Sequence, residues 1–158
     1  MARLKILAIA AATGRIGHVF FIGGKLKHWA MSVKASKSPE LAAQQAGQWI
    51  DELEPDVVIT EKIGKHSHKG KLTKQLIAAI AKVAKNRYLN DIVVPRAQDF
   101  QNKYEEAKEL AKQYPDILPW MPKRPRIWES EPRNMIYFEA LALALDVFNA
   151  DKPASNVA

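Results

Sequence analysis

An apolar run near the start of the chain constrains the fold more than any other feature of this sequence. The run extends from Leu4 to Ala12 and ends at the Thr13-Gly14 pair, which gives it the length of one strand. An apolar strand that does not alternate with polar residues is expected to be covered on both faces. The sequence therefore predicts an α/β protein in which this strand lies at the centre of a sheet flanked by helices.

Shorter apolar segments predict four further strands. Ile16 to Ile22 and Leu26 to Val33 are separated by Gly23-Gly24, and glycine supplies the positive φ angles that a tight hairpin turn requires. Asp56 to Thr60 and Ile92 to Val94 contain short apolar cores, which are typical of buried strands. The sequence thus predicts a sheet of about five strands.

Helical periodicity and capping signals predict four helices. They are expected from Ser38 to Leu53, from about Leu76 to Asn86, from Phe100 to Pro115 and from Ser130 to about Phe148. The segment from Pro115 to Pro125 holds four prolines and is predicted to be a surface loop. The expected order of elements is βββαβαβα, in which the last α stands for two consecutive helices.

Length and composition favour one soluble domain with a basic surface. We expect a single domain over residues 1–148 and a flexible tail over residues 149–158. The absence of cysteine excludes disulfides and thiolate metal sites and fits a cytoplasmic protein, and no apolar run is long enough for a membrane segment. The formal net charge of +7 favours a polyanionic partner such as nucleic acid.

Two carboxylates occupy positions that suggest a site. Glu139 interrupts the otherwise apolar stretch from Met135 to Leu145, where a charged group is unfavourable unless it is paired or bound to a cation. Glu61 directly follows a predicted buried strand, at the end of the sheet where α/β proteins tend to bind ligands. The alternative for each is structural: Glu139 pairs with Arg133 or a lysine, and Glu61 faces solvent.

Basic residues cluster in two segments that could contact nucleic acid. The first is rich in lysine and histidine, contains no acid and directly follows Glu61, so that its cations could neutralise phosphates; its members are Lys62, Lys65, His66, His68, Lys69, Lys71 and Lys74. The second surrounds Trp120 and Trp128 and could contact both phosphates and bases; its cations are Lys123, Arg124 and Arg126. Arg15, after the first strand, is a further candidate for phosphate binding.

Taken together, these motifs resemble the RuvC-type Holliday-junction resolvases of the ribonuclease H-like superfamily. The resemblance rests on the Ile6-Leu7-Ala8-Ile9 strand with its Thr/Gly turn and hairpin, on Val57 to Glu61 before a basic loop, and on the run from Glu139 to Leu145. It implies a mixed central sheet, hydrolysis of branched DNA by bound Mg²⁺ or Mn²⁺, and a homodimer that cuts symmetrically.

The resemblance also implies which residues would form the metal site. By position, Glu61 would be the ligand on the fourth strand and Glu139 the ligand on the last helix, with Asn134 and Glu131 as possible supplements. The family's aspartate on the first strand falls at Ala10, and no acid precedes Glu40. Alanine cannot bind a cation, so the chain as written is predicted to cleave slowly or not at all.

Two other functions compete with a resolvase. The first is a protein of the same fold that binds nucleic acid without cleaving it. Ala10 favours this alternative, whereas the retained Glu61 and Glu139 disfavour it, because carboxylates repel phosphates. Alternatively, Ala11 to Gly17 approximates a glycine-rich dinucleotide-binding turn. That motif requires a helix directly after the turn, whereas Val19 to Gly24 predicts a strand and a turn.

Overall fold

A mixed sheet of five strands forms the middle layer of the computed structural model, which describes residues 3–63, 69–87, 90–95 and 103–150. The sheet order is β3-β2-β1-β4-β5, so the first apolar run of the chain is the central strand, as predicted. The strand bounds are β1 (Lys5–Ala12), β2 (Arg15–Ile22), β3 (Lys25–Ser32), β4 (Val57–Lys62) and β5 (Asn90–Pro95).

The strand directions bring the ends of β1 and β4 to one edge of the sheet. β1 pairs antiparallel with β2 and parallel with β4, while β5 continues the parallel half beside β4. The predicted hairpin of β2 and β3 is confirmed, with φ angles of 58° at Gly23 and 82° at Gly24. Parallel strands place their carboxyl ends together, so Ala12 and Lys62 end at the same edge.

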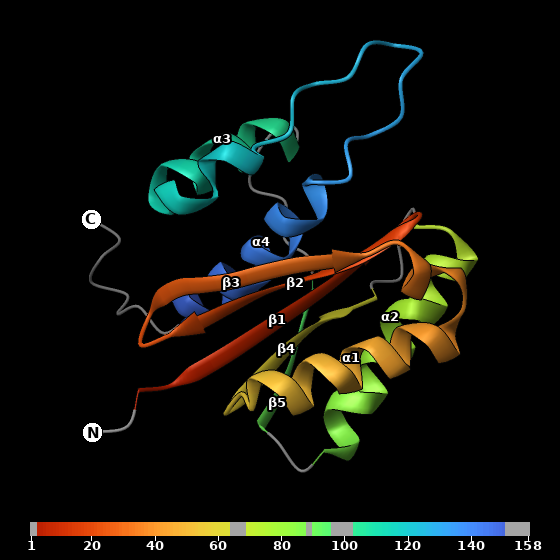
Figure 1. Cartoon of the computed structure of the whole chain (residues 1–158), viewed down its shortest axis with the longest axis vertical. Coiled ribbons are helices and arrows are strands. Elements are labelled where there is room, and N and C mark those ends of the chain that lie inside the picture. Colours follow the sequence, from red (N-terminus) through yellow and green to blue (C-terminus); the bar gives the residue numbers. More distant parts are fainter. Residues whose placement is uncertain (1–2, 64–68, 88–89, 96–102, 151–158) are drawn as a thin grey trace.

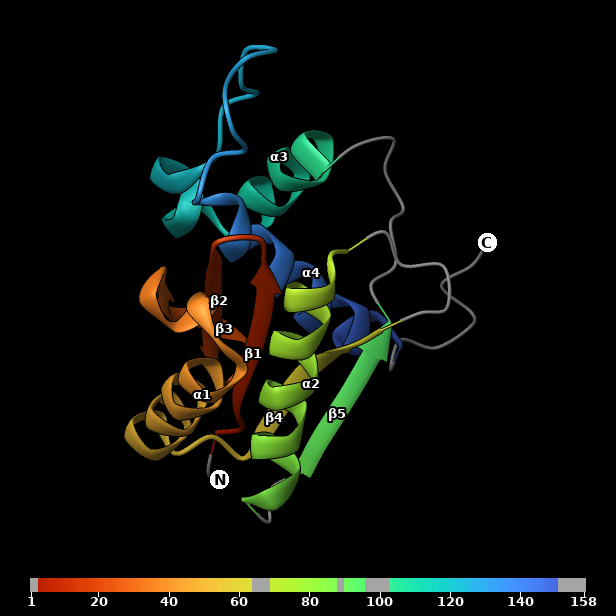
Figure 2. The same ribbon diagram turned by 90° about the vertical axis from the view of Figure 1, so that its right-hand side faces the viewer.

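Helices cover both faces of this sheet. One face carries α1 (Pro39–Leu53) and α2 (Lys71–Asn86), and the other carries α4 (Met135–Ala150) with α3 (Lys103–Gln113) beside it (Figures 1 and 2). Two short 3₁₀ helices connect these elements, η1 (Lys34–Lys37) and η2 (Pro115–Trp120). The α/β class and the predicted order of elements are confirmed.

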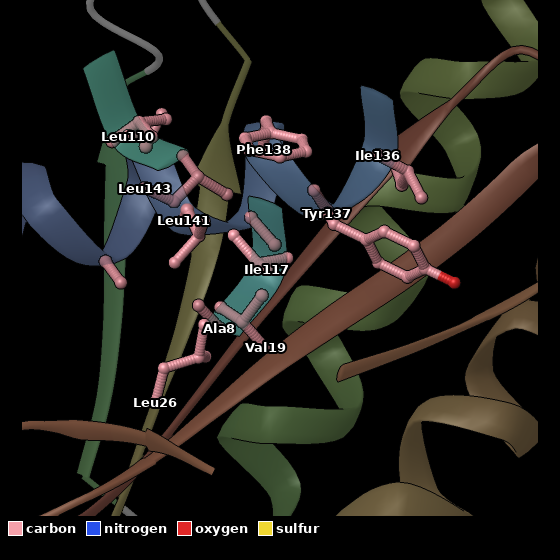
Figure 3. Close-up of a cluster of buried hydrophobic side chains, with 14 of the residues drawn as sticks. Ala8, Val19, Leu26, Leu110, Ile117, Ile136, Tyr137, Phe138, Leu141 and Leu143 are labelled. Atoms are coloured by element: carbon pink, nitrogen blue, oxygen red, sulfur yellow. The ribbon is translucent and has the colours of Figure 1, made fainter. Parts of the chain in front are cut away.

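The side chains of β1 point alternately to the two faces of the sheet, and each face has its own hydrophobic core. Ala8, Ala10 and Ala12 belong to the core beneath α4, whereas the residues between them belong to the core beneath α1 and α2. From residue 135 to residue 144 no residue of α4 is more than 8% exposed, so the helix is buried on all sides as predicted. Figure 3 shows its side chains against those of Val19 and Leu26 from the sheet.

Several element boundaries differ from the predictions; α2, for example, begins at Lys71 rather than at about Leu76. α4 begins at Met135 rather than Ser130, because the preceding residues form a turn in which the Pro132 carbonyl accepts from the Met135 amide at 3.1 Å. The segment predicted as a loop contains η2, which the fully buried Ile117 anchors to the core. α4 also extends two residues into the predicted tail, and residues 151–158 lie outside the described residues.

The turn after β1 excludes the dinucleotide-binding alternative. Gly17 lies within β2, which runs from Arg15 to Ile22, and no helix follows the turn. Without a helix amino terminus at this point the pyrophosphate of a dinucleotide has no binding site there, so that interpretation is wrong. Within the described ranges, no helix combines the length and apolar character needed to cross a membrane.

Candidate nucleic-acid and metal site

A cleft lies at the carboxyl end of β1, where the sheet meets the start of α4. Its volume is about 540 Å³. Its lining side chains are charged, hydroxyl or small and come from the β1–β2 hairpin, the start of α2 with the residues before it, α3, the segment before α4, and α4 itself: Ala12, Thr13, Arg15, Lys69, Thr73, Lys103, Ser130, Glu131 and Glu139. Residues from five separate parts of the chain therefore converge at the sheet edge that the sequence predicted.

Glu61 reaches this cleft through a lysine. It is 6% exposed at the end of β4, and Lys69 Nζ donates to Glu61 Oε1 at 2.7 Å and to the Ala11 carbonyl at 3.3 Å. Lys69 itself lines the cleft, so its ammonium lies between the ends of β1 and β4. Glu61 is therefore buried and paired, and it does not face solvent.

Glu131 and Glu139 share a second lysine, at the first residue of α3. Lys103 Nζ contacts a carboxylate oxygen of Glu131 and lies 3.7 Å from Glu139 Oε1. The guanidinium of Arg15, whose side chain is 7% exposed, also binds Glu131, and its other amino group donates to the Thr13 carbonyl at 2.7 Å. Glu131 thus links Arg15 of β2 to Lys103 of α3 at the cleft, and Glu139 lies beside the same lysine.

These ion pairs alter the proton affinity of their members. Burial acts to lower the pKa of Lys103, but its hydrogen bond to Glu131 and the negative charge of Glu139 outweigh burial and hold that pKa above its usual value. Burial acts to raise the pKa of Glu131, but the Lys103 ammonium and the Arg15 guanidinium hold that pKa below its usual value. Both groups are charged at neutral pH.

Ala10 is fully buried beneath α4, where the resemblance implies a carboxylate. It pairs with Gly17 of β2 and belongs to the same core as Ile59. Because side chains alternate along a strand, Glu61 shares the sheet face of Ile59, and that face also carries Ala10. A longer side chain at position 10 would therefore extend from the sheet face that carries Glu61 toward α4, the helix that carries Glu139.

The side chains present do not fit a divalent metal centre. Each of the three carboxylates already contacts a cation, and β1 contributes no oxygen ligand at position 10. Among the described residues, no three potential ligands lie close enough together to hold one ion. Three acids and three bases balance each other here, namely Glu61, Glu131 and Glu139 against Arg15, Lys69 and Lys103.

The remaining predicted residues that the structure describes do not line the cleft. Asn134 donates its side-chain amide to the Trp120 carbonyl at 2.9 Å and is not among the lining residues. Lys62 and Lys71 are exposed, and Lys74 is half-buried. The predicted nucleic-acid contacts Lys65, His66 and His68 lie outside the described residues, whereas Lys123, Arg124 and Arg126 are exposed on the segment between η2 and α4.

Sequence reasoning missed several lining residues, among them Lys103 and Thr73. Lys103 begins a helix rich in lysine and glutamate, so nothing in its local pattern distinguishes it from other surface lysines. Thr73 lies in the first turn of α2, buried beside Lys69, and its spacing from Lys69 was the only available signal.

Several solved structures share the architecture of this chain, and Holliday-junction resolvases are among them. RuvC from Thermus thermophilus matches with a TM-score of 0.57 over 93% of this chain and 95% of its own, at 16% identity. The fowlpox virus resolvase in complex with Holliday junction DNA matches with a TM-score of 0.58 over 92% and 99%, at 18% identity. The yeast mitochondrial Holliday junction resolvase Ydc2 matches with a TM-score of 0.55 over 89% and 76%, at 11% identity.

No protein-family model and no curated protein matches the sequence. At identities this low, the similarity to solved structures concerns the arrangement of the chain rather than its chemistry. The order of elements and the mixed sheet agree with those structures over almost the whole chain. The chain therefore has the ribonuclease H-like fold of the Holliday-junction resolvases, as its sequence motifs predicted.

Proposed function

We propose that this chain binds branched DNA at the cleft and is a resolvase-type endonuclease whose hydrolytic step is impaired by Ala10. The observation that carries the proposal is the convergence of Glu131 and Glu139 in the cleft, with Glu61 joined to it through Lys69, at the edge of a resolvase-type sheet. Carboxylates concentrated where a polyanion would lie are unfavourable unless cations accompany them. The proposed role accounts for both the acids and the cations beside them.

The cations of the chain perform the binding in this proposal. Lys62 and Lys71 are exposed at the end of β4 and the start of α2, on either side of Lys69, and would neutralise backbone phosphates. Lys69 and Lys103 keep the cleft acids neutralised, so that a phosphate can approach without repulsion. Lysines that bind phosphates act through charge alone, so this contact carries no base specificity.

The missing carboxylate accounts for the proposed loss of hydrolysis. In the proposed ancestry, an acid at position 10 would complete a set with Glu61 and Glu139 that binds Mg²⁺ or Mn²⁺. Such ions can activate water and stabilise the leaving oxygen of a phosphodiester. With Ala10, DNA binding without cleavage is the activity that the present residues support, and a non-catalytic DNA-binding role is therefore the second candidate function.

A homodimer is part of the same proposal. Cutting a four-way junction symmetrically requires two sites, and two cleft-bearing copies would supply them. Sedimentation of the purified chain with and without a four-way junction measures this directly: we expect two copies per junction, and one copy per junction at saturation would contradict it.

Binding to DNA is tested by salt titration with charge-matched variants. Lys62→Ala/Lys71→Ala removes two exposed lysines beside the cleft, whereas Lys25→Ala/Lys27→Ala removes two exposed lysines at the opposite end of the sheet. For a labelled four-way junction, we expect the slope of log K against log salt to decrease by about two for the first variant. The slope for the second variant should remain that of the parent chain.

The outcomes separate specific from general electrostatic attraction. Equal losses in the two variants would show that DNA responds to net charge rather than to the cleft edge. Binding that does not depend on salt, or no binding to branched DNA, would reject the proposed function.

A further inference from the structure

A projecting segment between η2 and α4 presents the most exposed apolar side chains of the described residues. This arm comprises residues 121–131 and extends away from the sheet and helices (Figure 1). Its base is held in place: Asn134 Nδ2 donates to the Trp120 carbonyl at 2.9 Å, and the Trp120 ring packs edge-on against Trp29 with centroids 5.1 Å apart. The arm is therefore anchored to β3 at one end and to the start of α4 at the other.

The tip of the arm is a tight turn closed by two reciprocal hydrogen bonds. The Glu129 amide donates to the Arg126 carbonyl at 2.9 Å, and the Arg126 amide donates to Glu129 Oε1 at 3.1 Å. The two residues enclosed by this turn, Ile127 and Trp128, are 98% and 74% exposed. A closed turn gives them no route back to the core, so their apolar surface is available to a partner.

Cations accompany the aromatic groups of the arm. The Arg126 guanidinium lies 5.6 Å from the centroid of Trp128, and that of Arg124 lies 5.6 Å from the centroid of Tyr104. The acids nearby are neutralised, since Glu129 lies 3.9 Å from Arg126 and Glu131 contacts Lys103. The arm carries three cations, Lys123, Arg124 and Arg126, against the two acids Glu129 and Glu131, so its net charge is positive. An aromatic face on a segment of net positive charge matches a nucleobase with its phosphate better than an acidic or apolar protein surface.

The arm also leads directly into the cleft. Ser130 and Glu131, which follow the tip, both line it. Any strand whose backbone enters the cleft would therefore pass close to the base of the arm. This continuity connects the exposed aromatic surface to the site where the phosphates are proposed to bind.

We propose that Trp128 stacks on an unpaired or splayed nucleobase of DNA held in the cleft, with Arg124, Arg126 and Lys123 contacting the adjacent phosphates. The inference rests on the proposed function and extends it, because it states which DNA the chain prefers. Bases within a continuous duplex are already stacked on their neighbours and have no free face for the indole. The arm therefore favours DNA with exposed bases, such as that at a branch point, over uninterrupted duplex.

The test uses two DNA probes and three variants. One probe is a forked duplex with a single 2-aminopurine in the unpaired region, and the other is an uninterrupted duplex of equal length with the same base paired. Trp128→Ala removes the proposed stacking surface, and Trp128→Phe retains an aromatic ring. Leu118→Ala is the matched control, because Leu118 is also an exposed apolar residue but lies on η2, outside the arm.

We expect Trp128→Ala to weaken binding of the fork by about tenfold, the loss typical of removing one base–aromatic stack. Duplex affinity should change less than about twofold, and the protein-induced change in 2-aminopurine fluorescence should disappear. Trp128→Phe should retain most of the fork affinity, and Leu118→Ala should match the parent chain on both probes.

Three results would overturn the inference. If Trp128→Ala bound the fork as tightly as the parent chain does, and likewise the duplex, the arm would not contact bases. That result would leave the cleft proposal intact. Loss of self-association in Trp128→Ala with unchanged DNA binding would identify a second copy of the chain as the occupant. Failure of the parent chain to bind either probe would reject the proposed function and the arm together.

Discussion

At the scale of single residues, the cleft is organised by the pairing of each acid with a base from a different element. Lys103 of α3 contacts Glu131 and lies 3.7 Å from Glu139 of α4, while Lys69 joins Glu61 of β4 to the end of β1. Such pairs contribute little where water screens them, but the removal of one partner leaves the other charge poorly solvated. The lysines therefore hold the cleft together as well as giving it charge.

Replacing Lys103 tests this pairing. We expect Lys103→Met to lower the free energy of unfolding by about 1–2 kcal/mol, a value reduced from that of a fully buried pair because the lysine side chain is 39% exposed. Lys112→Met on the same helix removes an exposed pair with Glu109 and should change stability by less than about 0.5 kcal/mol. Urea denaturation of both variants at neutral pH measures the difference, and equal effects would contradict it.

The pH dependence of this difference has a defined sign. The pKa of Glu131 is lower in the folded chain than in the unfolded chain, so the stabilisation by its pairs is present above the unfolded value of about 4.3 and is lost as pH falls through the folded pKa. The gap in stability between the parent chain and Lys103→Met should therefore narrow in acid. A gap that widens as the pH falls would contradict the pairing.

His18 makes a separate contribution to pH dependence. Burial, reinforced by the charge of His28, lowers the pKa of His18 from 6.5 to about 3. Between these values the unfolded chain binds a proton that the folded chain does not, so stability should fall as pH decreases from about 6.5 towards 3. We expect a loss of about 2 kcal/mol between pH 7 and pH 5, measured by urea denaturation.

Two substitutions separate His18 from other titrating groups. His18→Phe should remove most of this loss, whereas His28→Gln should retain most of it because burial of His18 is the larger cause. An unchanged pH profile in His18→Phe would show that other groups produce the loss.

At the scale of elements, the position of α4 depends on small residues in the sheet below it. A Cβ at Gly17 would lie 2.8 Å and 2.9 Å from the side chain of Ile136, closer than real contacts allow. The residues of β1 that face α4 at positions 8, 10 and 12 are alanines, whose side chains are a single methyl group, and Gly17 pairs with Ala10. The helix that carries Glu139 can therefore lie close to the sheet edge that carries Glu61.

Enlarging Gly17 tests this close approach. Gly17→Ala should lower the free energy of unfolding by about 1–3 kcal/mol, the range for overpacking in a core. Gly70→Ala is the control, since a Cβ there meets nothing within 4 Å and should change stability by less than about 1 kcal/mol. Ile136→Ala removes both Cγ atoms that the added Cβ would meet, so it should cost less in the Gly17→Ala background than in the parent chain. Strictly additive effects of the two substitutions would contradict direct contact.

At the scale of the whole molecule, a basic chain of net charge +7 places an almost neutral cluster of ion pairs at the end of its central strand. The excess positive charge therefore lies elsewhere, including the exposed lysines beside the cleft and the arginines of the arm. Under the proposed function, this division would let the cleft accept a phosphate while the surrounding surface supplies the attraction. We therefore expect a single change in the cleft to affect chemistry without affecting binding.

The sequence predicted those parts of the molecule whose signal is local. β1 and α4 could be recognised because burial on all sides requires apolar residues throughout, and Glu61 and Glu139 stood out against that background. Lys103 could not be recognised, because its role depends on α3 packing beside α4 rather than on its neighbours in the chain. The contact that Asn134 makes with the Trp120 carbonyl could not be recognised for the same reason, because it forms only once the base of the arm is folded; its role in the site stays a prediction.

The most direct test of the account is Ala10→Asp, assayed for stability and for cleavage of a four-way junction. A charged group at this fully buried position should lower the thermal midpoint in the presence of a chelator. Mg²⁺ or Mn²⁺ should then raise the midpoint of Ala10→Asp, but not that of the parent chain or of the isosteric, uncharged Ala10→Asn. We predict divalent-cation-dependent junction cleavage in Ala10→Asp alone; a folded Ala10→Asp chain that neither gains stability from these ions nor cleaves would contradict the account.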